Sequence, residues 1–275
     1  MTRILCRQLA PRVADLPANR EMSTRAIRDA VKSGADIVVL PELVTSGYVF
    51  TSAEEATSVA IGADDPLFKE WAAEAAKGAA VVVAGFCELG SDDLLYDSAA
   101  IVDGSGVLTI YRKTHLWDSE KRFFTAGTEA PPVIDTHAGR IGVLVCYDLE
   151  FPEMTRLLAL RGADVIVVPA NWPLVDHPLG ERPPEVIIAM AAARTNRVFI
   201  ACCDRTGSER GQEWTAGTVL INESGWVVAL PAEDGSAMAE FDPTRSRNKK
   251  LSAFNDALED RRPELYGDLS REKIA

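Results

Sequence analysis

Three ionisable side chains, Glu42, Lys113 and Cys146, each stand just after a segment that we expect to form a strand. A thiol is a useful nucleophile as a thiolate or beside a base, and a desolvated glutamate with a raised pKa is able to take its proton. A lysine ammonium stabilises the negative charge of a tetrahedral intermediate. Taken singly, these residues also fit a buried small cysteine, a solvated glutamate and a surface lysine. Together they predict nucleophilic catalysis by Cys146.

The segment around Cys146 has the pattern of a buried strand that ends in a turn and a helix. Residues 141–145 are apolar and rich in β-branched side chains, and Pro152 opens a helical pattern over residues 153–161. Reactive groups of α/β proteins lie at the carboxyl ends of sheet strands, where turn N–H groups are able to hold an oxyanion. Cys146 therefore stands where a nucleophile is expected.

Alternating strand and helix patterns predict an α/β protein. Helices are expected at 19–33, 66–77, 153–161 and 184–196, with Asn19 and Asp65 capping the first two. Strands are expected at 4–9, 36–40, 79–87, 98–102, 107–111, 141–145, 164–168, 198–203, 217–221, 226–229 and 237–241.

Two similar segments, GADIVVLP at 34–41 and GADVIVVP at 162–169, each follow a helix. Two such halves predict one four-layer domain over residues 1–275, with helices outside and two sheets face to face inside. The charged segment 244–275 is predicted to be a C-terminal tail that packs on the surface or on a partner subunit.

Composition narrows the class of protein. The 275 residues carry a formal net charge of −12, which argues against nucleic acid as a partner because phosphate binding needs a basic face. Five cysteines show neither a C-x-x-C motif nor the spacing of a disulfide framework, which is typical of a reducing compartment. No signal peptide and no apolar run of membrane-spanning length is evident. We expect a soluble cytoplasmic protein that does not bind membranes.

The reactive residues lie in motifs that resemble those of the nitrilase superfamily of carbon–nitrogen hydrolases. LPEL contains Glu42, YRKTHL contains Lys113 and VLVCYDLEFPE contains Cys146, in the order of the family. Further similar segments are RGADVIVVPANWP, ARTNR at 193–197 and DRRPELY in the tail. The similarity covers most of the chain and points to an amidase-like branch of the superfamily.

The resemblance implies a four-layer α-β-β-α sandwich of the nitrilase type and a Glu–Lys–Cys triad. It also implies a second glutamate, for which Glu120 is the best match and Glu129 the more distant one; a solvated loop acid is the alternative for Glu120. The backbone N–H of Tyr147 is implied as an oxyanion donor beside Lys113. The resemblance further implies a homodimer or larger homo-oligomer, and no metal or other cofactor is expected.

Substrate-binding residues are expected on the loops that follow the same strands. The candidates share an aromatic or amide side chain near the reactive groups, and they are Tyr48, Trp117, Tyr147, Asn171, Trp172 and Trp214. Tryptophans serve as often in cores as in pockets. Asp176 and Glu181, after Trp172, fit either contacts to a cationic substrate tail or a solvated loop.

The leading functional hypothesis is hydrolysis of a small aliphatic amide to a carboxylate and ammonia through a thioester on Cys146. Nitrile hydrolysis and N-carbamoyl-amine hydrolysis on the same site are the nearest alternatives. A non-catalytic binding module on the same fold belongs to another class, and the intact set of reactive residues argues against it. A Cys–His hydrolase using His115 is a further alternative.

Overall fold

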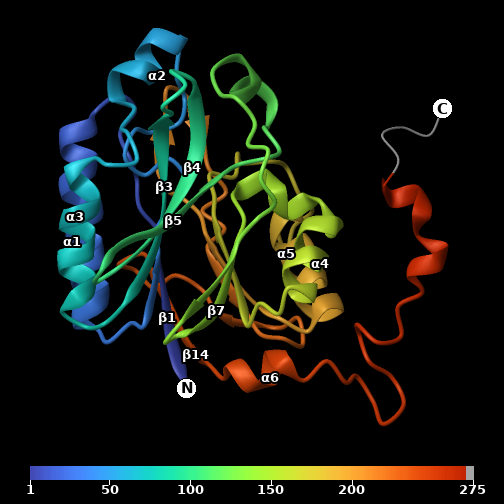
Figure 1. Ribbon diagram of the computed structural model, residues 1–275. Helices are drawn as coiled ribbons and strands as arrows, with labels where there is room; N and C mark the ends of the chain where they lie inside the picture. The colour runs from blue at the N-terminus through green and yellow to red at the C-terminus, as the bar shows by residue number, and fades with distance from the viewer. Residues whose placement is uncertain (271–275) are drawn as a thin grey trace.

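In the computed structural model, which describes residues 1–270, two six-stranded sheets stand face to face between pairs of helices (Figure 1). The first sheet has the order β14 (Ser236–Phe241), β1 (Thr2–Arg7), β2 (Ile37–Val39), β3 (Val81–Leu89), β4 (Leu95–Asp103) and β5 (Gly106–Arg112). The second has the order β13 (Val227–Ala229), β12 (Val219–Ile221), β9 (Phe199–Cys203), β8 (Val165–Pro169), β7 (Gly139–Val143) and β6 (Val133–Thr136). A short ribbon pairs β10 (Ser208–Glu209) with β11 (Gln212–Glu213).

Helices cover the outer faces of both sheets. On one side lie α1 (Leu16–Lys32) and α3 (Pro66–Ala76), and on the other α4 (Pro152–Leu160) and α5 (Pro184–Asn196), as Figure 1 shows. The remaining helical segments are α2 (Ala53–Val59), α6 (Pro243–Arg247) and the 3-10 turns η1 (Asp118–Arg122), η2 (Cys146–Glu150), η3 (Pro263–Leu265) and η4 (Gly267–Ser270). The predicted four-layer sandwich is therefore confirmed.

Alternation along the central strands explains the layers. In β2, Ile37 and Val39 join the core between the two sheets, whereas Val38 packs with Ile27 and Trp71 under the outer helices. Successive side chains of a strand point to opposite faces, so a strand that is buried on both sides needs an unbroken apolar run. The two GAD repeats supply such runs, and they form β2 and β8 at equivalent places in the two sheets.

The parallel centres and antiparallel edges follow from the connections. Helices join β1 to β2 and β2 to β3, and these strands pair in parallel, whereas tight turns produce the antiparallel β4–β5 and β12–β13 hairpins. The last strand, β14, pairs antiparallel with β1, so the end of the second half completes the first sheet.

Element boundaries were predicted well for α5 and α3, and Asp65 caps α3 as predicted, accepting a hydrogen bond from Leu67 N–H. The predicted cap at Asn19 is wrong. Helix α1 begins earlier and is capped by Asp15, because a proline in its first turn favours that start. The Asn19 side chain is buried and bonds the backbone of Arg12 instead. Helix α2 and strand β6 were not predicted.

The described part of the tail, from residue 244 to residue 270, begins within α6 and continues past it on the side of the molecule away from the first sheet (Figure 1). The last five residues of the predicted tail, 271–275, lie outside the described residues. Between residues 1 and 270, no helix combines the length and apolarity needed to cross a membrane.

Candidate active site

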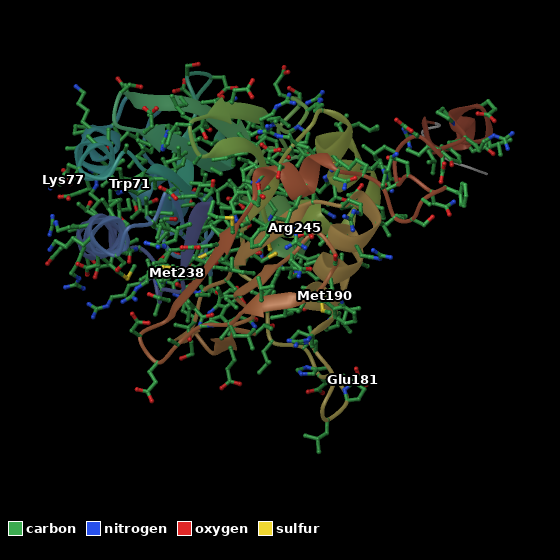
Figure 2. All side chains as sticks on the ribbon, turned by 90° about the horizontal axis from the view of Figure 1, so that it is seen from below. Trp71, Lys77, Glu181, Met190, Met238 and Arg245 are labelled. Atoms are coloured by element: carbon green, nitrogen blue, oxygen red, sulfur yellow. The ribbon has the colours of Figure 1, made fainter. Side chains whose placement is uncertain are left out.

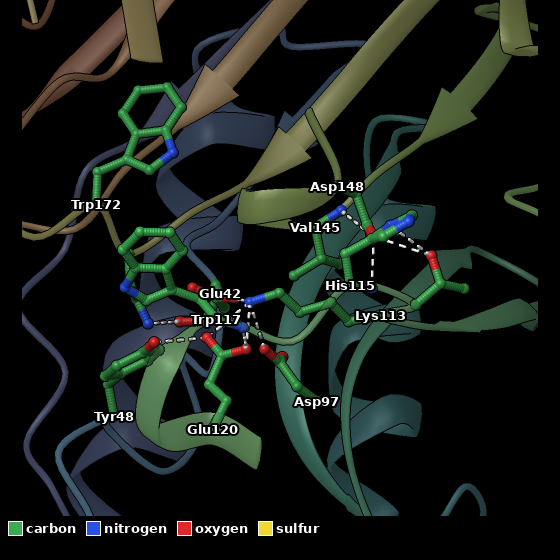
Figure 3. Close-up of polar contacts among 12 residues, drawn as sticks. Glu42, Tyr48, Asp97, Lys113, His115, Trp117, Glu120, Val145, Asp148 and Trp172 are labelled. Carbon is green, nitrogen blue, oxygen red and sulfur yellow. Dashed lines mark hydrogen bonds and ion pairs between the residues drawn. The ribbon is translucent and has the colours of Figure 1, made fainter. Parts of the chain in front are cut away.

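Lys113 lies at the centre of a buried cluster of carboxylates (Figure 3). Its Nζ is 2.6 Å from Glu42 Oε1, 2.7 and 2.8 Å from the two oxygens of Glu120, and 3.4 Å from Asp97 Oδ2. The Lys113 and Glu42 side chains have no exposed area, and that of Glu120 has 2%. The ammonium thus neutralises part of a concentrated negative charge that solvent does not reach.

Strand pairing explains why these side chains meet. Lys113 directly follows β5, and its N–H donates to Asp97 O of β4 at 2.8 Å, which continues the hairpin by one step. Glu42 follows β2, the strand next to β3. Gly85 of β3 passes so close that a Cβ there would lie 2.5 Å from Glu42 Cα, so only glycine fits beneath the glutamate.

Burial controls the protonation of this cluster. Burial raises the Glu42 pKa above its usual value, although the Lys113 charge opposes this shift. Burial also raises the Asp97 pKa well above its usual value, and the Glu42 charge raises it further. Burial alone lowers the Lys113 pKa, but the carboxylates, Glu120 first, raise it well above the usual value. Lys113 is therefore a stable cation, and Glu42 is a stronger base than an ordinary glutamate.

The same three carboxylates, Glu42, Asp97 and Glu120, lie close enough together to bind a metal ion. The Lys113 ammonium stands within 3.4 Å of an oxygen of each of them. An ammonium and a metal ion in the same place would repel each other, so this donor set suits the lysine.

Glu120 is held by contacts on both of its oxygens. Tyr48 Oη donates to Oε1 at 2.5 Å and the Trp117 N–H donates to Oε2 at 2.8 Å. The alternative of a solvated loop acid is wrong for Glu120, because η1 folds it inward onto Lys113. Glu129, the other candidate, is exposed.

Cys146 begins η2 and is separated from the end of β7 by Leu144 and Val145, and it has a positive φ of 46°. A left-handed conformation is unfavourable for a residue with a Cβ and persists where the surrounding structure imposes it, often at functional sites. Burial raises the pKa of the Cys146 thiol well above its usual value, and the Glu42 charge raises it further. The resting sulfur is consequently a thiol that needs a base.

Cys146 opens into a cavity of about 620 Å³ whose walls come from both halves of the chain. Its lining residues are Tyr48, Val49, Phe50, Trp117, Asp118, Ser119, Cys146, Tyr147, Glu150, Trp172, Pro173, Val175, Asp176, Pro184, Glu185, Ile188, Gln212 and Trp214. Five of the six predicted substrate-binding residues are among them. The sixth, Asn171, is buried outside the lining, and its Nδ2 donates to Glu42 O at 3.0 Å.

Three aspartates that sequence reasoning missed support the site. Asp97 interrupts an apolar strand, where aspartate is uncommon, and this was the one signal for it. Asp204 directly follows β9, as Glu42 follows β2, and accepts hydrogen bonds from the N–H groups of Trp172 and Gly217. Asp148 accepts a hydrogen bond from the Val145 N–H just before the cysteine.

His115 belongs to the Asp148 side of the site (Figure 3). Its Nδ1 is 2.8 Å from Asp148 Oδ1, and its ring stacks on Phe151 with the centroids 3.7 Å apart. His115 is not among the residues that line the Cys146 cavity. These contacts favour a supporting role for the histidine over a Cys–His pair.

Comparisons with known proteins agree with this geometry. The family model described as carbon–nitrogen hydrolase matches residues 3–250. A nitrilase from Pyrococcus abyssi is 34% identical over 269 residues, which cover 97% of this chain and 99% of the relative. An (R)-stereoselective amidase from a Pseudomonas species is 30% identical over 263 residues, covering 95% of this chain and 92% of the relative.

Solved structures add a likeness in three dimensions. A mutant of the amidase from Nesterenkonia sp. AN1 is 26% identical, with a TM-score of 0.79, and the match covers 98% of this chain and 100% of that one. That structure shows the result of Michael addition of acrylamide at the active-site cysteine of the amidase.

Proposed function

The chain belongs to the carbon–nitrogen hydrolase family, within the nitrilase superfamily, and from this premise we propose that it hydrolyses a small aliphatic amide to a carboxylate and ammonia through a thioester on Cys146. Its class is a hydrolase of non-peptide carbon–nitrogen bonds. The amidase names of relatives and structural neighbours support an amide substrate. Because one relative is named a nitrilase, a nitrile is the second candidate substrate.

One observation carries the proposal. Cys146 faces an open cavity, while directly behind it the Glu42 carboxylate is close enough to raise the pKa of the thiol. Glu42 in turn accepts a hydrogen bond from the Lys113 ammonium, which stays charged because the pKa of Lys113 is raised. A nucleophile that lines a substrate-sized cavity is therefore close to a buried base and a buried cation.

The mechanism follows from these positions. Glu42 takes the thiol proton as Cys146 Sγ attacks the amide carbon, and the Lys113 ammonium and the Tyr147 N–H stabilise the resulting oxyanion. The tetrahedral intermediate collapses, and the nitrogen leaves as ammonia with the proton from Glu42. Water then gives a proton to Glu42 and attacks the thioester, and that proton returns to the departing thiolate.

Glu120 has a positioning role in this scheme. It binds Lys113 with both oxygens and is itself held by Tyr48 and the Trp117 backbone, so it fixes the ammonium where the oxyanion forms. Asn171 has a similar role toward Glu42 through its hydrogen bond to the backbone oxygen of that residue.

The test is to trap the thioester. Hydroxylamine added during turnover of an amide should compete with water and yield a hydroxamate, and rapid-quench mass spectrometry should find the acyl group on the peptide that contains Cys146. The Cys146→Ala variant should give neither product, whereas Cys87→Ala, at a buried cysteine outside the cavity, should give both. Turnover without hydroxamate or adduct would indicate direct attack by water and overturn the proposal.

The same assay separates the rival substrates. An ammonia-release screen over amides, nitriles and N-carbamoyl amines should favour the amides, and a higher kcat/KM for nitriles would replace the proposal by the second candidate. EDTA should leave the rate unchanged, whereas iodoacetamide should abolish it by alkylating Cys146. If EDTA abolished the activity and added zinc restored it, the result would contradict a metal-free thiol mechanism.

Assembly and location complete the proposal. We propose a single domain that pairs as a two-fold dimer in the cytoplasm, supported by a core that joins both sheets and by five free cysteines within the described residues. Light scattering at micromolar concentration should give twice the mass of the chain, and a monomer would contradict the dimer.

A further inference from the structure

The wall of the Cys146 cavity is acidic. Asp118, Glu150, Asp176 and Glu185 line it, and among the described residues that do so there is neither a lysine nor an arginine. The buried Arg205 stacks on the Trp214 ring, with its Cζ 4.4 Å from the ring centroid, and its Nη2 is 3.2 Å from Glu209 Oε1. An acidic cluster alone can be a solvated face, so the burial and hydrogen bonds of each carboxylate decide whether it is available to a ligand.

Glu185 is not solvated. It is 9% exposed, and its Oε2 has no hydrogen-bond partner although it is buried. Glu185 lies in the first turn of α5, and a hydrogen bond from its own backbone N–H stabilises the ionised carboxylate and lowers its pKa. Burial nonetheless raises its pKa, so the helix terminus does not compensate for the loss of water.

Within residues 1–270, no group around Glu185 supplies a fixed counter-charge. Burial raises the pKa of Glu150, and the Glu185 charge raises it further, so the two carboxylates repel each other electrostatically. His177 is the base that lowers the Glu185 pKa, but it is exposed, and its Nδ1 lies against Val175 O at 3.1 Å. A buried carboxylate with a free oxygen and an acidic neighbour is a site for a cation from outside the chain.

Aromatic rings frame the same space. Trp117 and Tyr147 meet edge to face with centroids 4.8 Å apart, and Tyr48 and Trp214 do so at 5.3 Å. All four line the cavity. Aromatic faces attract ammonium and guanidinium groups and also accept the alkyl chain that carries them. The wall therefore suits a chain with an apolar body and a cationic end.

We propose that the substrate is an amide whose acyl chain ends in an ammonium or guanidinium group, with the amide at Cys146 and the cation at Glu185 and Glu150. This inference rests on the proposed amidase function and specifies its substrate. Glu185 takes the cation directly through its free oxygen, and Glu150 adds charge from the more exposed side. A second carboxylate on the substrate would meet acidic side chains with no cation to receive it.

The test compares pairs of substrates on the purified full-length enzyme. Straight-chain ω-amino amides of increasing length are set against alkyl amides in which a methyl group replaces the ammonium, and against ω-carboxy amides. We expect kcat/KM for the best ω-amino amide to exceed that of its methyl counterpart at least about tenfold, the scale of a hydrogen bond to a charged group. The ω-carboxy amides should be the poorest substrates.

Variants then assign the preference to residues. Glu185→Gln keeps the size of the side chain and should reduce the ratio of ω-amino to alkyl amide rates about tenfold or more, and Glu185→Asp should keep part of it. Glu150→Gln should reduce the ratio less, because that carboxylate is exposed. The matched control is Glu181→Gln, on a loop that projects from the body in Figure 2 and outside the cavity lining; it should keep the ratio.

The outcomes separate the two proposals. Ammonia release from alkyl amides at rates equal to or above those of ω-amino amides would overturn the cation site and leave the amidase function standing. The cation site would also be overturned if Glu185→Gln, shown by circular dichroism to be folded, kept the preference for ω-amino amides unchanged. No ammonia release from any amide would instead contradict the amidase function itself.

Discussion

One acidic cluster is buried close to Cys146 and another lines the cavity into which Cys146 opens, and the two differ in what neutralises them. Behind Cys146, three carboxylates surround the Lys113 ammonium, which is within hydrogen-bond distance of Glu42 and Glu120. Along the wall, no described residue forms an ion pair with Glu150 or Glu185, and Glu185 Oε2 is buried without a hydrogen bond. The inner cluster has a cation within the chain, Lys113, although Glu42 Oε2 and both Asp97 oxygens also lack hydrogen-bond partners. The described part of the wall has no such cation, and a substrate can provide one.

The largest expected effect comes from removing the inner cation. Lys113→Met leaves buried carboxylates uncompensated, so it should lower the free energy of unfolding by about 3–5 kcal/mol and reduce kcat/KM by several orders of magnitude. Chemical denaturation and steady-state kinetics measure the two effects. Lys77→Met is the control, because Lys77 pairs with Glu74 at the surface and should cost at most about 1 kcal/mol. Equal effects of the two variants would break the distinction between the inner cluster and a surface ion pair.

The next effect tests the base. Glu42→Gln should lower kcat/KM at least about a hundredfold, the usual contribution of a general base, and should slow both acylation and thioester hydrolysis. His115→Ala, which removes the ring that stacks on Phe151, should retain measurable turnover. The reverse ranking in single-turnover assays would favour a Cys–His site over the inner carboxylate cluster.

The pH dependence should report the same base. Because burial raises the Glu42 pKa and the base works only when ionised, kcat/KM should fall about tenfold per pH unit below that raised value. The acid limb should therefore lie above the pKa of an ordinary glutamate, about 4.3. Lys113 stays protonated because its own pKa is raised, so it should not limit the neutral range. Full activity down to about pH 4.3 in a stable enzyme would contradict the assignment.

A smaller effect is expected where the two regions join. Asp204 accepts hydrogen bonds from the N–H groups of Trp172, Arg205 and Gly217, and burial raises its pKa to about 7 despite them. Asp204→Asn places an amide N–H against one of these donors, which should cost about 1–3 kcal/mol of stability. The melting temperature should drop by about 2–4 °C per kcal/mol.

The control for this substitution is Asp234→Asn. Its side chain is 61% exposed, so the change should cost less than about 0.5 kcal/mol. A melting temperature that Asp204→Asn leaves unchanged would mean that Asp204 does not hold the cavity wall through Trp172.

The smallest effect should have the opposite sign to the first. Glu185→Gln removes an uncompensated charge and some favourable interaction with the α5 terminus, so its net effect on stability should be below about 1 kcal/mol. Because the folded-state pKa of Glu185 is raised, the wild type loses stability as pH rises through and above the unfolded-state pKa, about 4.3. The variant should therefore gain relative to the wild type as pH rises. A large destabilisation that grows with pH would mean that Glu185 has a counter-ion within the chain.

Local pattern was enough to predict much of this molecule. Glu42 and Cys146 follow apolar segments of strand length, and the α5 bounds follow from a proline start and a long alanine-rich run. The β4–β5 hairpin was also predicted, yet its consequence for Asp97 was missed. Its register pairs Ser98 with Arg112, so the next residues along each strand, Asp97 and Lys113, stand opposite each other.

The sequence by itself determined which reactive residues exist, that each follows a strand, and that two repeated halves form two sheets. Only the tertiary structure decided which carboxylates receive the lysine. Glu42 and Lys113 are 71 positions apart, and the Glu120 side chain is held inward by Lys113, Tyr48 and the Trp117 backbone. The free oxygen of Glu185 is likewise a property of packing, because burial and hydrogen bonding depend on neighbours that are remote in the chain, whereas sequence patterns report only local preference.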